Sequence, residues 1–107
     1  VQSRPEPRKA LLTLGKRDIG YDEPPPALAW YRPGTVPRRP EPLSSGHAVT
    51  GFNDQHCHLA LPPDSPLDVG DMVAFGVSHP CLTFDKWQVL MIVDDAYRVV
   101  DAVRTFF

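Results

Sequence analysis

Residues 89–103 read VLMIVDDAYRVVDAV, two runs rich in β-branched and aliphatic side chains with a short acidic segment between them. Such side chains favour strands because they pack well on a pleated, half-buried surface. Asp94–Ala96 has the length of a tight connection, so the pattern predicts an antiparallel hairpin of two strands, Gln88–Val93 and Arg98–Val103. No helical period runs through the stretch, which therefore indicates an all-β chain.

Five runs upstream have the same strand character. Each is short, rich in β-branched, aromatic or leucine residues, and bounded by glycine, proline or aspartate. They are Lys9–Leu14, Leu28–Tyr31, His47–Phe52, His56–Leu61 and Met72–Val77. Turns are expected at Arg32-Pro33-Gly34 and, as a second hairpin, at Val69-Gly70-Asp71. Only Thr83–Trp87 is suited to a single helical turn.

Proline is abundant, with 13 among the 107 residues, and it is concentrated in Glu23–Pro42 and Pro62–Pro66. Each proline removes a backbone donor and fixes φ, so both stretches are predicted to be loops. Six to seven short strands joined by proline-rich loops predict a small antiparallel β-barrel or sandwich. The length is that of one domain with a modest core, so residues 1–107 are expected to form a single domain.

Charge and hydropathy exclude two classes of partner. The net charge is −2, so no general positive field would attract nucleic acid. The longest apolar run, Val89–Val93, is far shorter than the roughly 20 residues of a membrane-spanning helix. The two cysteines are too few for a disulfide framework, which favours a cytoplasmic protein with reduced thiols. The start, Val1–Pro5, has neither an initiator methionine nor a signal-peptide pattern, so we expect a piece of a longer polypeptide.

The segment Ser78-His79-Pro80-Cys81 is the sharpest chemical feature. In an extended segment His79 and Cys81 would project to one side, with Cα atoms about 6–7 Å apart. Imidazole nitrogen and thiolate sulfur together suit zinc, and the proline between them would stiffen the pair. The alternative is a loop histidine beside a buried apolar thiol. Two ligands do not complete a structural zinc site, although they could form part of a catalytic one.

A second polar cluster is Asn53-Asp54-Gln55-His56-Cys57-His58. In a strand His56 and His58 would share one face, while Cys57 takes the other. Three interpretations are open: a second metal site, residues that orient the His79 and Cys81 ligands, or an exposed edge. Gly15-Lys16-Arg17-Asp18 could bind an anion, but such a segment is more typical of a solvated turn.

These motifs, in this order, resemble the C-terminal region of bacterial amino-acid deaminases of the D-serine dehydratase-like group. The stretches that carry the resemblance are Leu14–Asp18, Asp54-Gln55-His56, Val69-Gly70-Asp71, Ser78–Trp87 and Val93–Val103. The resemblance implies an alanine-racemase-type enzyme of fold type III, in which an N-terminal (β/α)8 barrel binds pyridoxal phosphate (PLP) and a C-terminal β domain follows. It extends over nearly the whole chain and departs from the family pattern at Cys57.

The resemblance also implies roles for three side chains. His79 and Cys81 match a metal-binding pair for zinc or another divalent ion, and His56 matches a catalytic position at the mouth of the active site. Relatives with D-threonine aldolase activity have aspartate in place of Cys81, so the thiol favours dehydratase or deaminase chemistry. A β-hydroxy amino acid such as D-serine would yield a 2-oxo acid and ammonia, with PLP as electron sink and the metal as Lewis acid on the leaving hydroxyl.

The implied partner is the PLP barrel of the same polypeptide, in a parent enzyme expected to be a homodimer that acts on a small amino acid. No lysine of this chain matches the Schiff-base residue, so the isolated chain is expected to be inactive. The alternative is a non-catalytic β-barrel interaction module, which would dock through Phe106-Phe107 and the proline loops and would have its own start. Two aromatics at the end of a chain indicate a covering partner in either case.

Overall fold

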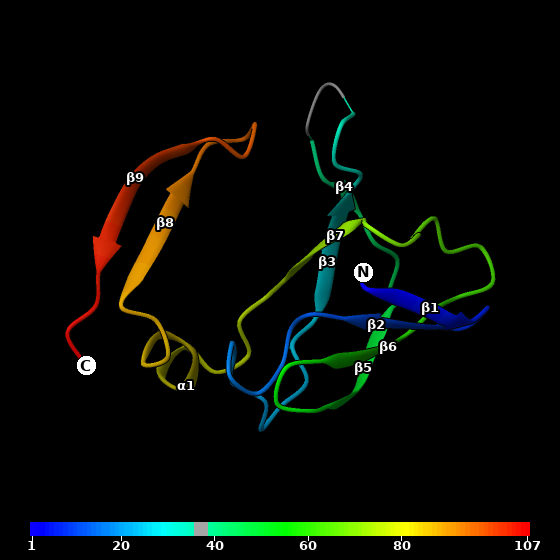
Figure 1. Cartoon of the computed structure of the whole chain (residues 1–107), viewed down its shortest axis with the longest axis horizontal. Coiled ribbons are helices and arrows are strands. Elements are labelled where there is room, and N and C mark those ends of the chain that lie inside the picture. Colours follow the sequence, from blue (N-terminus) through cyan, green and yellow to red (C-terminus); the bar gives the residue numbers. More distant parts are fainter. Residues whose placement is uncertain (36–38) are drawn as a thin grey trace.

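The computed structural model describes residues 1–35 and 39–107, which form short strands and one short helix (Figure 1). In chain order the elements are β1 (Ser3–Glu6), β2 (Lys9–Leu12), β3 (Ala27–Tyr31), β4 (Glu41–Pro42), β5 (Ala48–Phe52), β6 (Cys57–Ala60), β7 (Met72–Phe75), α1 (Pro80–Phe84), β8 (Val89–Val93) and β9 (Val99–Arg104). The prediction of an all-β fold is confirmed, and every predicted strand overlaps an observed one. The predicted helical turn at Thr83–Trp87 begins earlier, at Pro80.

The core is built on an antiparallel sheet with the strand order β1-β2-β6-β5. In the pairing of β2 with β6, Ala10 lies opposite Leu59 and Leu12 opposite Cys57. All four side chains are buried, because alternate residues of a strand point to the same face. Leu61 completes this interior, so the alternating pattern of the two strands forms the centre of the core.

A second sheet, β4-β3-β7, contributes further apolar side chains to this core. Trp30 of β3 and Phe75 of β7 are among the partly buried residues that pack against the first sheet. Of the two predicted alternatives, a barrel and a sandwich, the arrangement is the sandwich. The barrel alternative is wrong for the described residues, because their strands form three separate sheets and no edge strand of one sheet pairs with an edge of another.

Two edge strands were not predicted. Pro5 lies in β1 and Pro42 in β4, and proline was interpreted as a loop signal. Both strands lie at the edge of a sheet, where a residue without an N–H can be accommodated. The predicted loop Glu23–Pro42 therefore contains strand residues, and its positions 36–38 lie outside the described residues.

The predicted turns are present, but one of them does not close a hairpin. Gly34 has φ 88° and Gly70 has φ 93°, a backbone conformation that glycine adopts without steric cost. The turn at Gly70 precedes β7, which pairs with the distant β3 rather than with the preceding strand β6. The hairpin predicted at Val69–Asp71 is therefore wrong, because the pairing of β7 is determined by the packing of the two sheets.

An ion pair ties the end of β3 to the start of β7 in this second sheet. Arg32 Nε donates to Asp71 Oδ1 at 2.8 Å, and Arg32 Nη2 donates to Asp71 Oδ2 at 3.0 Å. The side chain of Asp71 is only 1% exposed. Burial acts to raise the pKa of Asp71, but the hydrogen bonds from Arg32 and from the Asp68 amide outweigh it and hold this pKa below its usual value.

The third sheet is the predicted hairpin of β8 and β9, which stands apart from the two-sheet body (Figure 1). Its turn is fixed by Asp94, whose Oδ1 accepts from the amides of Ala96 and Arg98. A contact between the rings of Tyr31 and Tyr97, with centroids 5.3 Å apart, connects the tip of the hairpin to the end of β3. No helix among the described residues is long and apolar enough to cross a membrane.

Candidate functional site

The motifs singled out in the sequence meet around residues 15–23, here called the connecting segment. At its start the Lys16 amide donates to Asn53 O at 3.0 Å, and the Arg17 amide donates to Asp54 O at 3.1 Å. A Cβ atom on Gly15 would lie 2.2 Å from Asp54 O, so only glycine permits this approach. The Gly15 amide donates to Asp18 Oδ2 at 2.8 Å. Gly15–Asp18 is therefore a turn closed by its own carboxylate, in line with the turn that the sequence favoured over an anion site.

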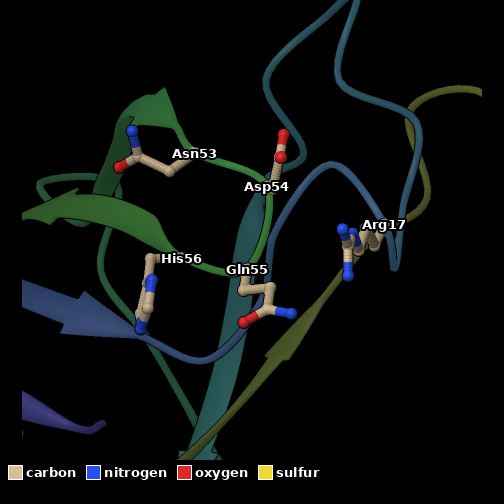
Figure 2. A pocket seen from close by; sticks show the side chains of 5 residues that line it. All are labelled: Arg17, Asn53, Asp54, Gln55 and His56. Carbon is tan, nitrogen blue, oxygen red and sulfur yellow. The ribbon is translucent and has the colours of Figure 1, made fainter.

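The connecting segment and the β5–β6 turn border an open surface recess of about 570 Å³. It is lined by Arg17, Asn53, Asp54, Gln55 and His56, and Figure 2 shows Arg17 across from Asp54 and Gln55. An adjoining recess of about 330 Å³ includes Asp18 and shares Arg17, Gln55 and His56. His56 is partly exposed, and it precedes β6 instead of lying within the predicted strand.

Other residues of the Asn53–His58 cluster lie partly at the surface and partly in the core. Asn53 Oδ1 and His58 Nε2 lie 2.8 Å apart and form a hydrogen bond across the turn. Cys57 is fully buried, and burial raises the pKa of its thiol to about 11. Within residues 1–35 and 39–107 no group of three His, Cys, Asp or Glu side chains could hold a metal, so a second, self-sufficient metal site is not found there. The exposed-edge interpretation fits Asn53–Gln55.

The two residues predicted to bind a metal, His79 and Cys81, lie at the start of α1. His79 is the N-cap residue, with φ −136° and ψ 92°, and Pro80 begins the helix. Cys81 therefore sits in the first helical turn, with an exposed free thiol. The extended geometry assumed for Ser78–Cys81 is wrong beyond His79, because proline at the first helical position favours the helix. Convergence of the two side chains on one ion stays a prediction.

A carboxylate that sequence reasoning missed faces His79. Asp22 Oδ2 lies 2.7 Å from His79 Nδ1, and the two side chains are 48% and 40% exposed. The hydrogen bond to His79 lowers the pKa of Asp22. The two residues are 57 positions apart, so no local pattern connects them. The acidic residues of the connecting segment were the only available signal.

Further hydrogen bonds fasten the connecting segment to the motif Ser78–Trp87. Ser78 Oγ donates to Glu23 O at 2.8 Å, the Gly20 amide donates to Thr83 Oγ1 at 2.9 Å, and Trp87 Nε1 donates to Asp18 O at 2.8 Å. The start of the motif thus bonds to the end of the connecting segment and the end of the motif to its start, so the two segments are antiparallel. Together with the Asp22–His79 bond these hydrogen bonds form what we call the motif clamp. The connecting segment thus bonds to the β5–β6 turn before His56 at one end and to the motif that contains His79 at the other.

The available donors fit an open metal site. A solvent-accessible imidazole and a thiol are the ligand types that zinc prefers. The described part of the chain provides no third residue to complete a cluster, so the remaining positions would be left to water, substrate or another domain.

The fold and these side chains define a class: a small all-β domain with a histidine–cysteine pair at a helix start and an open polar recess lined by Arg17 and the β5–β6 turn. Residues 1–93 match the family model described as "Putative serine dehydratase domain". The chain belongs to this serine dehydratase domain family, which confirms the resemblance stated from the motifs. A search of curated proteins found no match.

Proposed function

We propose that the chain is the C-terminal, metal-binding domain of a PLP-dependent amino-acid dehydratase or deaminase. Its substrate would be a β-hydroxy amino acid of the D-serine type, converted to a 2-oxo acid and ammonia. The observation that carries the proposal is membership of the serine dehydratase domain family over residues 1–93, which include His56, His79 and Cys81. A divalent metal would supply Lewis-acid stabilisation of the departing hydroxyl, and PLP would supply the electron sink.

Each of the three side chains has a task in this proposal. His79 and Cys81 would hold the metal at the surface of the domain, where their exposure leaves room for substrate. His56 would act as the catalytic residue, because it lines both recesses and an imidazole can accept or donate a proton near neutral pH. Arg17, on the wall of the same recess, is suited to attract an anionic substrate group.

The PLP barrel of the same polypeptide is the partner we propose, in a homodimeric parent enzyme. The exposed apolar side chains of the β8–β9 hairpin support a covering partner. Met91, Val99 and Val100 are each 62% exposed, and Phe106 and Phe107 are 87% and 81% exposed. Several large apolar side chains exposed on one element are typical of an interface.

The same surface favours a second candidate function, a non-catalytic interaction module. The two candidates differ in their need for the thiol. An interaction module would bind its partner through the apolar hairpin whether or not Cys81 is present, whereas the enzyme needs Cys81 for turnover.

The test uses the parent polypeptide and measures oxo-acid release from D-serine with PLP. Cys81→Ala and removal of metal by a chelator should each abolish most of the activity, while Cys57→Ala serves as a matched control for loss of a thiol. The 107-residue chain alone should release no oxo acid. Full activity of the Cys81→Ala enzyme would contradict the metal role, and turnover by the isolated chain would contradict the dependence on a barrel.

A further inference from the structure

The contact between Asp22 and His79 has a chemical consequence for the metal pair. An ionised carboxylate can only accept hydrogen bonds, so the 2.7 Å contact requires the proton on His79 Nδ1. In a neutral imidazole with Nδ1 protonated, Nε2 has the free lone pair. Asp22 thus selects the tautomer of His79 that leaves Nε2 free to bind a metal.

The position of Asp22 is built into the fold. On either side of it the connecting segment is bonded to the motif, through the Gly20 amide to Thr83 Oγ1 and through Glu23 O to Ser78 Oγ. Thr83 Oγ1 in turn donates to His79 O at 2.9 Å. The backbone of His79 and the segment that bears Asp22 are therefore held together independently of the Asp22 side chain.

Gly20 allows the close approach on which this geometry depends. A Cβ atom there would lie 3.0 Å from both His79 Cβ and His79 O. Such a contact is tighter than nine in ten real Cβ contacts, so a larger residue would shift the segment from His79 by a few tenths of an ångström. The Asp22–His79 distance would lengthen as a result.

Stabilisation of the fold alone does not explain why the chain holds Asp22 and His79 together. Asp22 and His79 are 48% and 40% exposed, and ion pairs at such exposed positions contribute little to folding because water screens them. The other bonds of the motif clamp do not involve the Asp22 side chain. The effect of Asp22 on the basicity and orientation of a metal-binding imidazole is larger, because partners of this type change metal affinity by about 10–100-fold.

We propose that Asp22 is a positioning residue for the metal site: its carboxylate holds the His79 ring and directs Nε2 toward the ion. The proposal rests on the proposed function, in which His79 and Cys81 bind the metal. It adds a residue outside the His-x-Cys motif and explains why the connecting segment is fastened to that motif.

The first measurement needs no metal. In the metal-free 107-residue chain, long-range ¹H–¹⁵N NMR spectra of the imidazoles should show His79 as the Nδ1–H tautomer. Asp22→Ala should shift His79 toward the Nε2–H tautomer, whereas Asp22→Asn should largely restore the wild-type spectrum because its Oδ1 still accepts. Asp64→Ala, which removes an exposed carboxylate in another loop, is the matched control and should leave His79 unchanged.

The second measurement titrates the same chains with Co²⁺ and follows the thiolate-to-cobalt absorption from Cys81. Asp22→Ala should weaken Co²⁺ binding by about 10–100-fold, with a smaller loss for Asp22→Asn and none for Asp64→Ala. An unchanged tautomer and an unchanged affinity in Asp22→Ala would overturn the role of Asp22 while leaving the metal site intact. Absence of the thiolate absorption from the wild-type chain would instead overturn the metal site itself. If Asp22→Ala does not fold, the comparison of Asp22→Asn with Asp64→Ala decides the question by the same two readouts.

Discussion

The buried carboxylate of Asp71 shows how one residue can dominate the junction of two strands. Its oxygens accept from Arg32 and from the Asp68 amide, and its side chain is almost inaccessible to water. Val69-Gly70-Asp71 was part of the family resemblance. In the structure this motif has an architectural role: it positions β7 against β3 through the bond to Arg32.

Replacement of Asp71 by alanine should destabilise the chain by about 1–3 kcal/mol, since the Asp68 amide and Arg32 lose their acceptor. The pKa of Asp71 is lowered in the folded chain, so its contribution is complete above the unfolded value of about 3.9 and is lost as the pH falls through the lower folded value. Urea unfolding at pH 7 and at a series of acidic pH values measures both effects. A difference between wild type and variant that grew on acidification would contradict this assignment.

Two glycines provide a matched pair of substitutions. Gly15→Ala places a Cβ atom 2.2 Å from the Asp54 carbonyl oxygen, whereas a Cβ atom on Gly51 meets nothing within 4 Å. We expect Gly15→Ala to cost about 1–3 kcal/mol through steric strain. Gly51→Ala should change stability by less than about 1 kcal/mol.

The free energy of unfolding of the two glycine variants is the direct comparison, and the NMR shifts of His56 report the accompanying change in the recess. Equal stability of Gly15→Ala and Gly51→Ala would show that the close approach of the connecting segment to the β5–β6 turn is not maintained in solution.

Among the elements, strands were predictable where their pattern is local. The alternation that places Ala10, Leu12, Cys57 and Leu59 in the core is visible in the sequence, and so is the acidic turn of the β8–β9 hairpin. The pairing of β3 with β7 was not predictable, because it joins strands separated by three others in the chain and depends on packing across the core. The edge strands β1 and β4 were hidden by their prolines.

The candidate site was predictable in part for the same reason. His79 and Cys81 stand out by spacing and His56 by the density of polar neighbours, all of which are local signals. The partner of His79 was not recognisable, because Asp22 approaches it from a distant part of the chain. The geometry assumed for the pair failed at Pro80, whose fixed φ suits a helix start as well as a loop.

The motif clamp yields a prediction at its most buried bond. Thr83 is 7% exposed, and its hydroxyl accepts from the Gly20 amide and donates to His79 O. Thr83→Val keeps the shape but leaves the Gly20 amide unpaired, which should cost about 1–3 kcal/mol. Thr50→Val, on an exposed part of β5, is the control and should be nearly neutral.

Amide hydrogen exchange can locate the effect of Thr83→Val. Protection should fall along residues 18–23 and α1, while the core strands β2 and β6 should retain theirs. A loss of protection spread evenly over all strands would contradict the view that the clamp is a local device.

At the level of the whole molecule, a two-sheet body bears a separate hairpin (Figure 1). Several apolar side chains of this hairpin are exposed. The exposure expected for Phe106-Phe107 is confirmed. The body positions the recess and the motif clamp, and the hairpin bears the exposed apolar side chains on which the proposed partner rests. This arrangement agrees with the proposed function, in which the domain acts together with a PLP barrel.

The metal pair is the point on which the proposed function depends. The measurement is the zinc content of the 107-residue chain after equilibration with zinc and removal of the excess, with His79→Ala, Cys81→Ala and Cys57→Ala compared in parallel. Our account predicts one zinc ion per chain in the wild type and in Cys57→Ala, bound more weakly than at a four-ligand structural site, and a loss of binding in the other two variants. Zinc retained equally in all four proteins, or in none of them, would contradict it.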